Sequence, residues 1–176
     1  MKRFLAGLFM ALWLGAVPAL AGDVFPDLPL LGSPGEEQAA YLGLDGGEAR
    51  PSAVKADFLF VEVFNMYCTI CQHDAPTINA LFDKLKASDL AGKVRFVGIG
   101  TGNSTLEVKV YRDKLKVAFP LFEDPDYVWH KALGEVGTPT FYLVDLRHGL
   151  EIAFKHTGAL EDADEALKTI RGLVTP

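Results

Sequence analysis

Two cysteines give this sequence a means of performing redox chemistry. Cys68 and Cys71 are the only cysteines of the 176-residue chain, and they form the motif Cys68-Thr69-Ile70-Cys71. In the first turn of a helix this spacing puts both side chains on one face, about 5–6 Å apart, so a disulfide can open and close with little backbone movement. A helix N-terminus favours the thiolate of Cys68, whereas Cys71 is expected to be buried and less acidic. One sulfur could then attack a foreign disulfide and the other resolve the mixed disulfide.

The same motif has three other interpretations. A static structural disulfide would close a very short loop and would therefore stabilise the fold little. A zinc site needs about four ligands, whereas His73 points elsewhere on a helix and His130, His148 and His156 are remote in the sequence. Two unrelated buried thiols are the third alternative. Because the chain supplies too few ligands near the cysteines, we expect no metal site here.

The N-terminus has the pattern of an export signal. Met1-Lys2-Arg3 precedes an uncharged run from Phe4 to Val17 and then Pro18-Ala19-Leu20-Ala21, whose small residues suit a signal peptidase. We predict a signal peptide over residues 1–21 and a periplasmic or otherwise extracytoplasmic protein. The alternative is an uncleaved membrane anchor, because the uncharged run reaches Gly22 and a spanning helix needs about 20 residues. A disulfide persists in such a compartment unless something reduces it.

Length and charge limit the remaining possibilities. Cleavage leaves about 155 residues, which suits one domain with a sizeable core. The formal net charge is −6 and becomes more negative when Lys2 and Arg3 are removed, so no nucleic acid is expected as a partner. Residues 22–56 contain many Gly and Pro residues and are predicted to form an irregular arm, with a short hairpin near 41–44. Residues 57–176 should form the domain.

The pattern of apolar residues predicts an α/β domain. A strand buried on both faces, 58–64, leads into the cysteine motif, and the following helix runs to about Ser88 with Pro76 inside it. A second buried strand, 94–99, is therefore parallel to the first. Further predicted elements are a helix from Ser104 with a capping box to Glu107, a short strand at 119–122 and a helix capped by Asp126. They are followed by two hairpin strands at 141–145 and 150–155 and by a helix at 161–173. The glycines at 98, 100 and 102 lack the spacing of a dinucleotide-binding motif.

These features together resemble the thioredoxin fold and, within it, the TlpA/ResA-like exported thiol-disulfide oxidoreductases. Four of them match in spacing over roughly residues 25–175. The cysteine motif follows a buried strand, Pro76 lies five residues beyond Cys71, Glu62 lies six residues before Cys68, and Gly137-Thr138-Pro139-Thr140 precedes a strand. The resemblance implies a mixed central sheet flanked by helices, with an extra strand and helix between about Ala91 and Leu133.

The resemblance also implies roles for five residues. Cys68 would be the nucleophile and Cys71 the resolving thiol, with Thr138 and a cis-Pro139 beside them. Glu62 lies on the strand face that also carries Phe58, Phe60 and Phe64, so burial should raise its pKa and let it take the proton of Cys71. The alternative is a structural Glu62 paired with a lysine such as Lys55.

The resemblance leaves the direction of electron flow open, because Tyr67 stands where tryptophan is usual and Thr69-Ile70 is neither Gly-Pro nor Pro-His. We expect a monomeric disulfide reductase without a cofactor beyond the redox-active Cys68–Cys71 disulfide, recharged by a membrane thiol reductase and acting on disulfide-containing client proteins, for example in cytochrome c maturation. Alternatives are a disulfide oxidant or isomerase and a Cu(I) carrier. A peroxidase fits less well, because Asn65 occupies the position of a required threonine.

Overall fold

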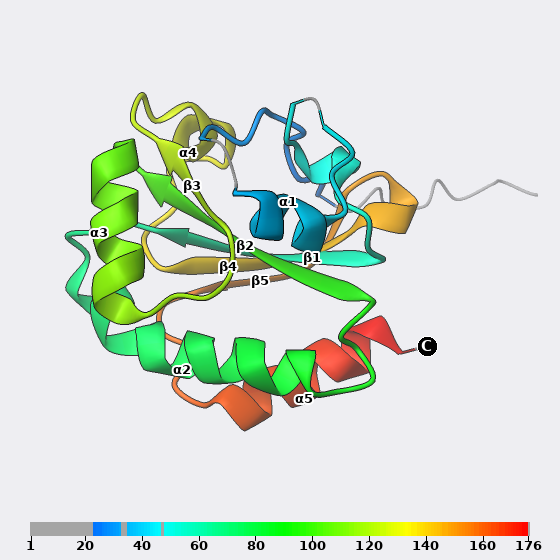
Figure 1. The fold of residues 1–176 in the computed structure, drawn as a ribbon. Helices are drawn as coiled ribbons and strands as arrows, with labels where there is room; N and C mark the ends of the chain where they lie inside the picture. The colour runs from blue at the N-terminus through cyan, green and yellow to red at the C-terminus, as the bar shows by residue number, and fades with distance from the viewer. Residues whose placement is uncertain (1–22, 33–34, 47, 176) are drawn as a thin grey trace, which may run out of the picture.

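The computed structural model describes residues 23–32, 35–46 and 48–175. A five-stranded mixed sheet crosses the centre of the molecule in the order β3-β2-β1-β4-β5 (Figure 1). β1 (Phe58–Phe64), β2 (Val94–Thr101) and β3 (Leu121–Asp124) are parallel to one another. β4 (Thr140–Asp145) and β5 (Glu151–Thr157) continue the sheet in antiparallel fashion. The predicted α/β class and the parallel pairing of the first two strands are therefore confirmed.

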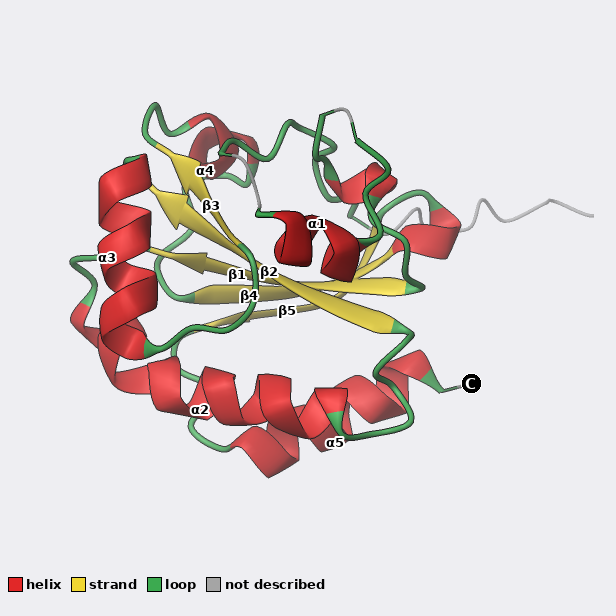
Figure 2. Cartoon of the chain, viewed as in Figure 1, coloured by secondary structure: helices red, strands yellow, loops and turns green. Residues whose placement is uncertain are grey.

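Helices cover both faces of the sheet (Figure 2). α2 (Thr69–Lys86) and α5 (Ala163–Val174) lie together on one face, and α3 (Thr105–Leu115) adds Val108 and Tyr111 to the core on that side. α1 (Glu36–Leu42), α4 (Val128–Ala132) and the short turns η1 (Pro51–Ala53) and η2 (Leu146–His148) complete the elements. All seven residues of β1 are buried, as the uninterrupted apolar pattern predicts for a central strand.

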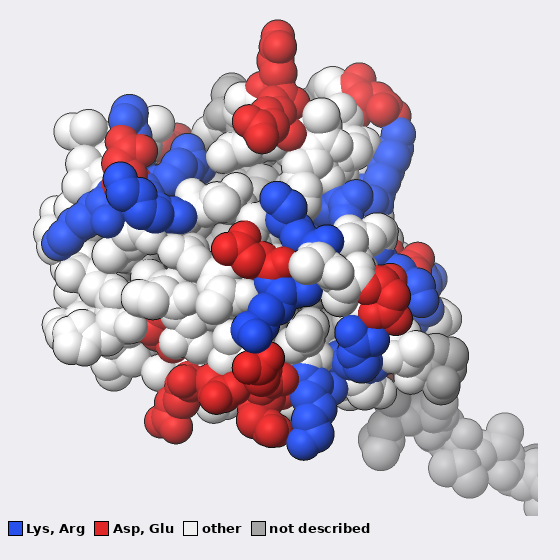
Figure 3. All heavy atoms as spheres, turned by 60° about the horizontal axis from the view of Figure 1, so that its bottom comes forward, with Lys and Arg blue, Asp and Glu red and all other residues white. Residues whose placement is uncertain are grey.

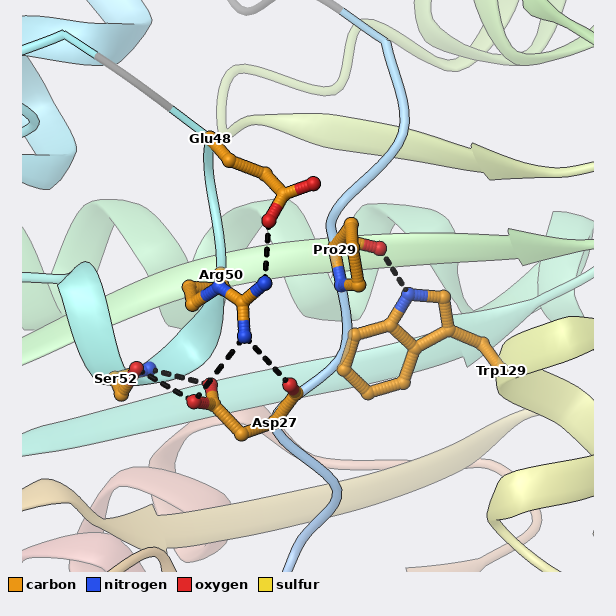
Figure 4. A network of polar contacts seen from close by, with 6 residues as sticks. All are labelled: Asp27, Pro29, Glu48, Arg50, Ser52 and Trp129. Atoms are coloured by element: carbon orange, nitrogen blue, oxygen red, sulfur yellow. Dashed lines mark hydrogen bonds and ion pairs between the residues drawn. The ribbon is translucent and has the colours of Figure 1, made fainter.

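The segment before β1 packs on the second face of the sheet. Its Phe25, Leu30 and Leu42 join the core that includes Trp129 of α4. Asp27 accepts hydrogen bonds from the backbone and hydroxyl of Ser52 at 3.0 and 2.7 Å, while Arg50 bonds to the Asp27 carbonyl at 3.2 Å (Figure 4). This segment is thus part of the packed structure, because it covers an apolar sheet face that would otherwise meet water.

Two local predictions were wrong. Residues 36–42 form α1 where a hairpin was expected near 41–44, because Leu42 is fully buried and the left-handed Gly43 ends the helix. Asp124 in β3 accepts from the backbone N–H groups of Trp129 and His130, both at 3.0 Å, so it and not Asp126 satisfies the start of α4. Asp124 lies five residues before Trp129. Its carboxylate can reach these donors because the chain turns back at Tyr127, whose φ is 58°.

The glycine at position 98 has a packing role. A Cβ atom there would overlap the side chain of Leu121 in β3, the neighbouring strand. Close packing of the two strands within the core therefore explains why residue 98, in the run of alternating glycines, is a glycine.

The predicted signal peptide, residues 1–21, lies outside the described residues. Within the described ranges, no helix has the length and apolar character needed to cross a membrane.

Candidate active site

Cys68 begins α2 and lies at the surface. It occupies the N-cap position, and its Sγ accepts a hydrogen bond from the backbone N–H of Cys71 at 3.1 Å. The side chain is partly exposed, whereas the neighbouring Tyr67 and Ile70 are 68% and 53% exposed. The orphan N–H groups of a helix N-terminus stabilise negative charge at this sulfur. Cys68 is therefore the sulfur that a large partner can reach.

Cys71 is placed very differently. It has no exposed surface and lies in the core beneath the sheet. Burial raises the pKa of its thiol, and the hydrogen bond with Cys68 and the charge of Glu62 add to that effect. The two thiols thus show the predicted asymmetry of exposure, and Cys71 needs a nearby proton acceptor before it can act as a nucleophile.

The segment that precedes β4 approaches Cys68 from the other side. The Thr138–Pro139 peptide bond is cis, and the Thr138 carbonyl accepts a hydrogen bond from the Cys68 thiol at 3.3 Å. The Pro139 carbonyl accepts from Gly158 N–H at 2.9 Å, which ties the β5–α5 loop to the same place. Residues 70 positions apart in the sequence are thereby brought together.

Glu62 lies in the middle of β1 beneath this site. Its side chain is 2% exposed, and its strand partners are Gly98 and Phe141. Burial raises the pKa of Glu62 to about 8, with a further rise from the charge of Asp74 and a partial reduction by a hydrogen bond with Tyr111. Lys55 pairs with Asp45 at the surface, so it is not the partner of Glu62. A carboxyl group with this pKa can gain or lose a proton near neutral pH.

Asp74 is a second buried carboxylate that the sequence analysis missed. It is 4% exposed, and its Oδ2 accepts from the Leu160 backbone N–H at 2.9 Å. The signal was present in the sequence: Asp74 falls three residues after Cys71 and four before Ile78, on the buried stripe of α2. A charged residue on such a stripe is costly and therefore indicates a specific role.

Polar side chains hold the turn before Cys68 against β2 and α3. Asn65 Nδ2 donates to the Thr101 carbonyl at 2.7 Å, and Asn103 Oδ1 accepts from Met66 N–H at 2.8 Å. The Tyr67 hydroxyl donates to Glu107 Oε1 at 2.6 Å. The sequence analysis found Glu107 only as part of a capping box, because its contact with Tyr67 spans 40 positions.

The described residues contain no group of three or more His, Cys, Asp or Glu side chains arranged to hold a metal ion. What the site does contain is a partly exposed thiol, a buried thiol, a titratable carboxyl group and a cis-proline, on the sheet and helix of a thioredoxin fold. That combination defines a class of protein that exchanges thiols and disulfides.

Comparison with known proteins supports this class. No family model matches the chain. It is 22% identical over 128 residues to the thiol-disulfide oxidoreductase ResA of Geobacillus thermodenitrificans, covering 73% of this chain and 71% of that protein. The thioredoxin domain of a thiol-disulfide oxidoreductase from Bacteroides vulgatus has a TM-score of 0.62 at 18% identity, with 89% of this chain and 99% of that chain covered. A secreted disulfide oxidoreductase of Mycobacterium tuberculosis, homologous to E. coli DsbE, has a TM-score of 0.59 at 17% identity, covering 72% and 90%.

The structural neighbours show that the chain has a thioredoxin-like fold. The curated relatives, at 22–23% identity, are ResA thiol-disulfide oxidoreductases, so the chain resembles proteins of that activity in both sequence and fold.

Proposed function

We propose that this protein is an exported disulfide reductase in which Cys68 and Cys71 form the redox pair. The observation that carries the proposal is the pairing of a reachable sulfur at a helix start with a buried thiol beside Glu62, whose pKa is raised to about 8. Each thiol then has the surroundings that one of the two exchange steps requires.

In the first step the Cys68 thiolate attacks one sulfur of a client disulfide. A bond forms between Cys68 and that sulfur, and the other client sulfur leaves as a thiolate that takes a proton from water. The Thr138 carbonyl and the cis-Pro139 beside Cys68 offer an extended client segment a backbone partner. Pro139 has no N–H that would compete for the Cys68 sulfur.

In the second step Glu62 accepts the proton of Cys71, whose thiolate attacks the Cys68 sulfur. The mixed disulfide breaks, the Cys68–Cys71 disulfide forms, and the second client sulfur leaves as a thiolate. Two electrons have passed from the protein to the client. Burial of Cys71 makes a positioned base necessary, because water reaches this thiol poorly.

The direction of electron flow depends on how far the reduced pair is stabilised, because strong oxidants stabilise their reduced form. Burial disfavours the thiolate at Cys71, as the raised pKa of this thiol shows, whereas Cys68 lies at the helix start and accepts one backbone hydrogen bond. We place this protein on the reductase side, and the reduction potential of the pair tests this placement.

Export and partners complete the proposal. The signal-like residues 1–21 support an extracytoplasmic location, and one protein of similar fold is described as secreted. In such a compartment the oxidised pair needs a source of electrons, for which we propose a membrane thiol reductase. Disulfide-containing client proteins, including those of cytochrome c maturation, are the proposed substrates.

Two measurements test the direction and the roles of the thiols. The reduction potential of the pair, measured by equilibration with glutathione buffers, should lie nearer that of thioredoxin, about −270 mV, than that of DsbA, about −120 mV. Cys71→Ser should trap mixed disulfides with client proteins, because the attack by Cys68 remains possible and resolution does not.

Cys68→Ser is the matched control and should trap few clients. A potential near that of DsbA would assign the protein to disulfide oxidation. Equal trapping by both variants, or trapping by Cys68→Ser alone, would contradict the proposed roles.

A further inference from the structure

A groove opens beside the cysteine pair. It has a volume of about 370 Å³, and its walls include Thr69 and Ile70 from between the two cysteines. His73 and Asp74 of α2 form one side, and Ala159 and Glu161 of the β5–α5 loop form the other. Because Gly158 of the same loop bonds to the Pro139 carbonyl, the groove borders the place where a client disulfide must meet Cys68.

Two carboxylates line this groove. Asp74 is 4% exposed and uses Oδ2 to accept from Leu160 N–H, whereas within the described ranges no hydrogen bond reaches its Oδ1. Glu161 is exposed at the opposite wall, in a left-handed backbone conformation with φ of 60°. Asp74 Oδ1 is not fully enclosed, so water or another hydrogen-bond donor that enters the groove can bond to it.

The described lining of the groove includes no lysine or arginine. Two lysines farther along α2 and α5 have other partners: Lys84 pairs with Asp164 at 2.7 Å, and Lys168 pairs with Glu165 at 3.3 Å. Figure 3 shows that acidic side chains gather at the lower edge of the face formed by α2 and α5. Asp74 and Glu161 therefore face no lysine or arginine across the described lining of the groove, where His73 is the basic residue.

We propose that the groove binds a cationic side chain, lysine or arginine, that flanks the disulfide of the client protein. This inference rests on the proposed function, since it names a substrate feature that the same site selects. The ammonium or guanidinium group donates hydrogen bonds to Asp74 Oδ1 and pairs with Glu161. The aliphatic stem of the side chain packs on Ile70, which is 53% exposed.

Peptide kinetics test the proposal. Peptides with one internal disulfide and a fluorescence reporter carry lysine, glutamine or glutamate beside the cysteine and are otherwise identical. Reduced protein should act on the lysine peptide with a kcat/KM about 3- to 10-fold above that for the glutamate peptide, as expected for partly exposed ion pairs. High salt should shrink the ratio, because it screens exposed charges.

Glu161→Gln should reduce this ratio, and Glu161→Lys should invert it. Glu161→Asn removes the charge with a residue that tolerates the left-handed backbone, so it should agree with Glu161→Gln if the charge is what matters. Glu151→Gln, an equal charge change at an exposed position at the far end of β5, is the matched control and should leave the ratio unchanged.

Equal rates for the lysine and glutamate peptides would overturn the proposal, as would an unchanged ratio in Glu161→Lys. If Glu151→Gln lowered the ratio as much as Glu161→Gln does, general attraction of cationic peptides to an acidic protein would replace the proposal. Reduction of the glutamine peptide by the parent and not by Cys68→Ser would still uphold the proposed function in each of these cases. Failure to reduce any peptide would overturn both.

Discussion

Two carboxylates on adjacent strands of the sheet have opposite surroundings. Asp145 ends β4, where Arg147 donates to it from Nη2 at 2.6 Å and from the backbone at 2.9 Å, and His148 Nδ1 lies 3.0 Å away. These partners, Arg147 first, hold the pKa of Asp145 well below its usual range. Glu62 lies in the middle of β1 near another acid, Asp74, and its pKa is raised to about 8.

The difference shows what distinguishes a structural carboxylate from a candidate catalytic one. Asp145 is at the edge of the buried region, so a turn of the chain can supply an arginine that stays partly in water. Glu62 is enclosed by apolar strands, and the fold provides one hydroxyl, that of Tyr111, without a cation. A carboxyl group that folding leaves without a counter-charge keeps its proton to higher pH, and this property suits proton transfer to and from Cys71.

The largest effect that we expect from this contrast is on the kinetics of disulfide exchange. Glu62→Gln keeps the size of the side chain and removes its proton transfer, so we expect the release of reduced product to slow by about 10²-fold. Its dependence on pH should flatten around pH 8, while the first attack by Cys68 changes little. Single-turnover measurements that follow both steps across pH separate the two effects. A variant that matches the parent in the second step at every pH would make Glu62 a structural residue like Asp145.

The stability of the protein gives a second test. Between about pH 4.5 and pH 8 the unfolded chain has released the proton of Glu62 while the folded chain keeps it, so the free energy of unfolding falls as the pH rises. Glu62→Gln removes this dependence and should exceed the parent in stability by on the order of 2–4 kcal/mol above about pH 8. Denaturant unfolding at low and high pH measures the difference. If the parent gains stability over this range, Glu62 is ionised and paired in the folded state.

Asp145→Asn should show the opposite behaviour with a smaller effect. It removes charge-assisted hydrogen bonds from Arg147 and should lower the free energy of unfolding by about 1–2 kcal/mol near pH 7. The lowered pKa of Asp145 stabilises the fold above its unfolded pKa, and this contribution is lost as the pH falls below about 4. The variant and the parent should therefore converge in acid, with disulfide exchange unchanged at neutral pH. A variant impaired in exchange would connect Asp145 with the active site.

Spacing along the sequence was sufficient to predict the parts of the site that depend on local geometry. The cysteine motif after a buried strand predicts a thiol at a helix start, and the alternation of side chains in a strand places Glu62 on the same face as its phenylalanine neighbours. Periodicity likewise predicted the order of strands and helices from β1 onward. These features follow from covalent geometry and from apolar patterning within one element, and both can be read without knowing which elements meet.

Only the tertiary structure decided which distant groups surround the thiols. It brings Thr138 to Cys68 and sets Asp74 close enough to Glu62 to raise its pKa. It also placed the end of α1 where a hairpin was expected at 41–44, because the buried position of Leu42 depends on the sheet face that this residue covers. Burial and the pairing of charges arise between segments far apart in the chain, so the pKa of Glu62 and the acidic groove at Asp74 and Glu161 exist only once the sheet and its helices have assembled.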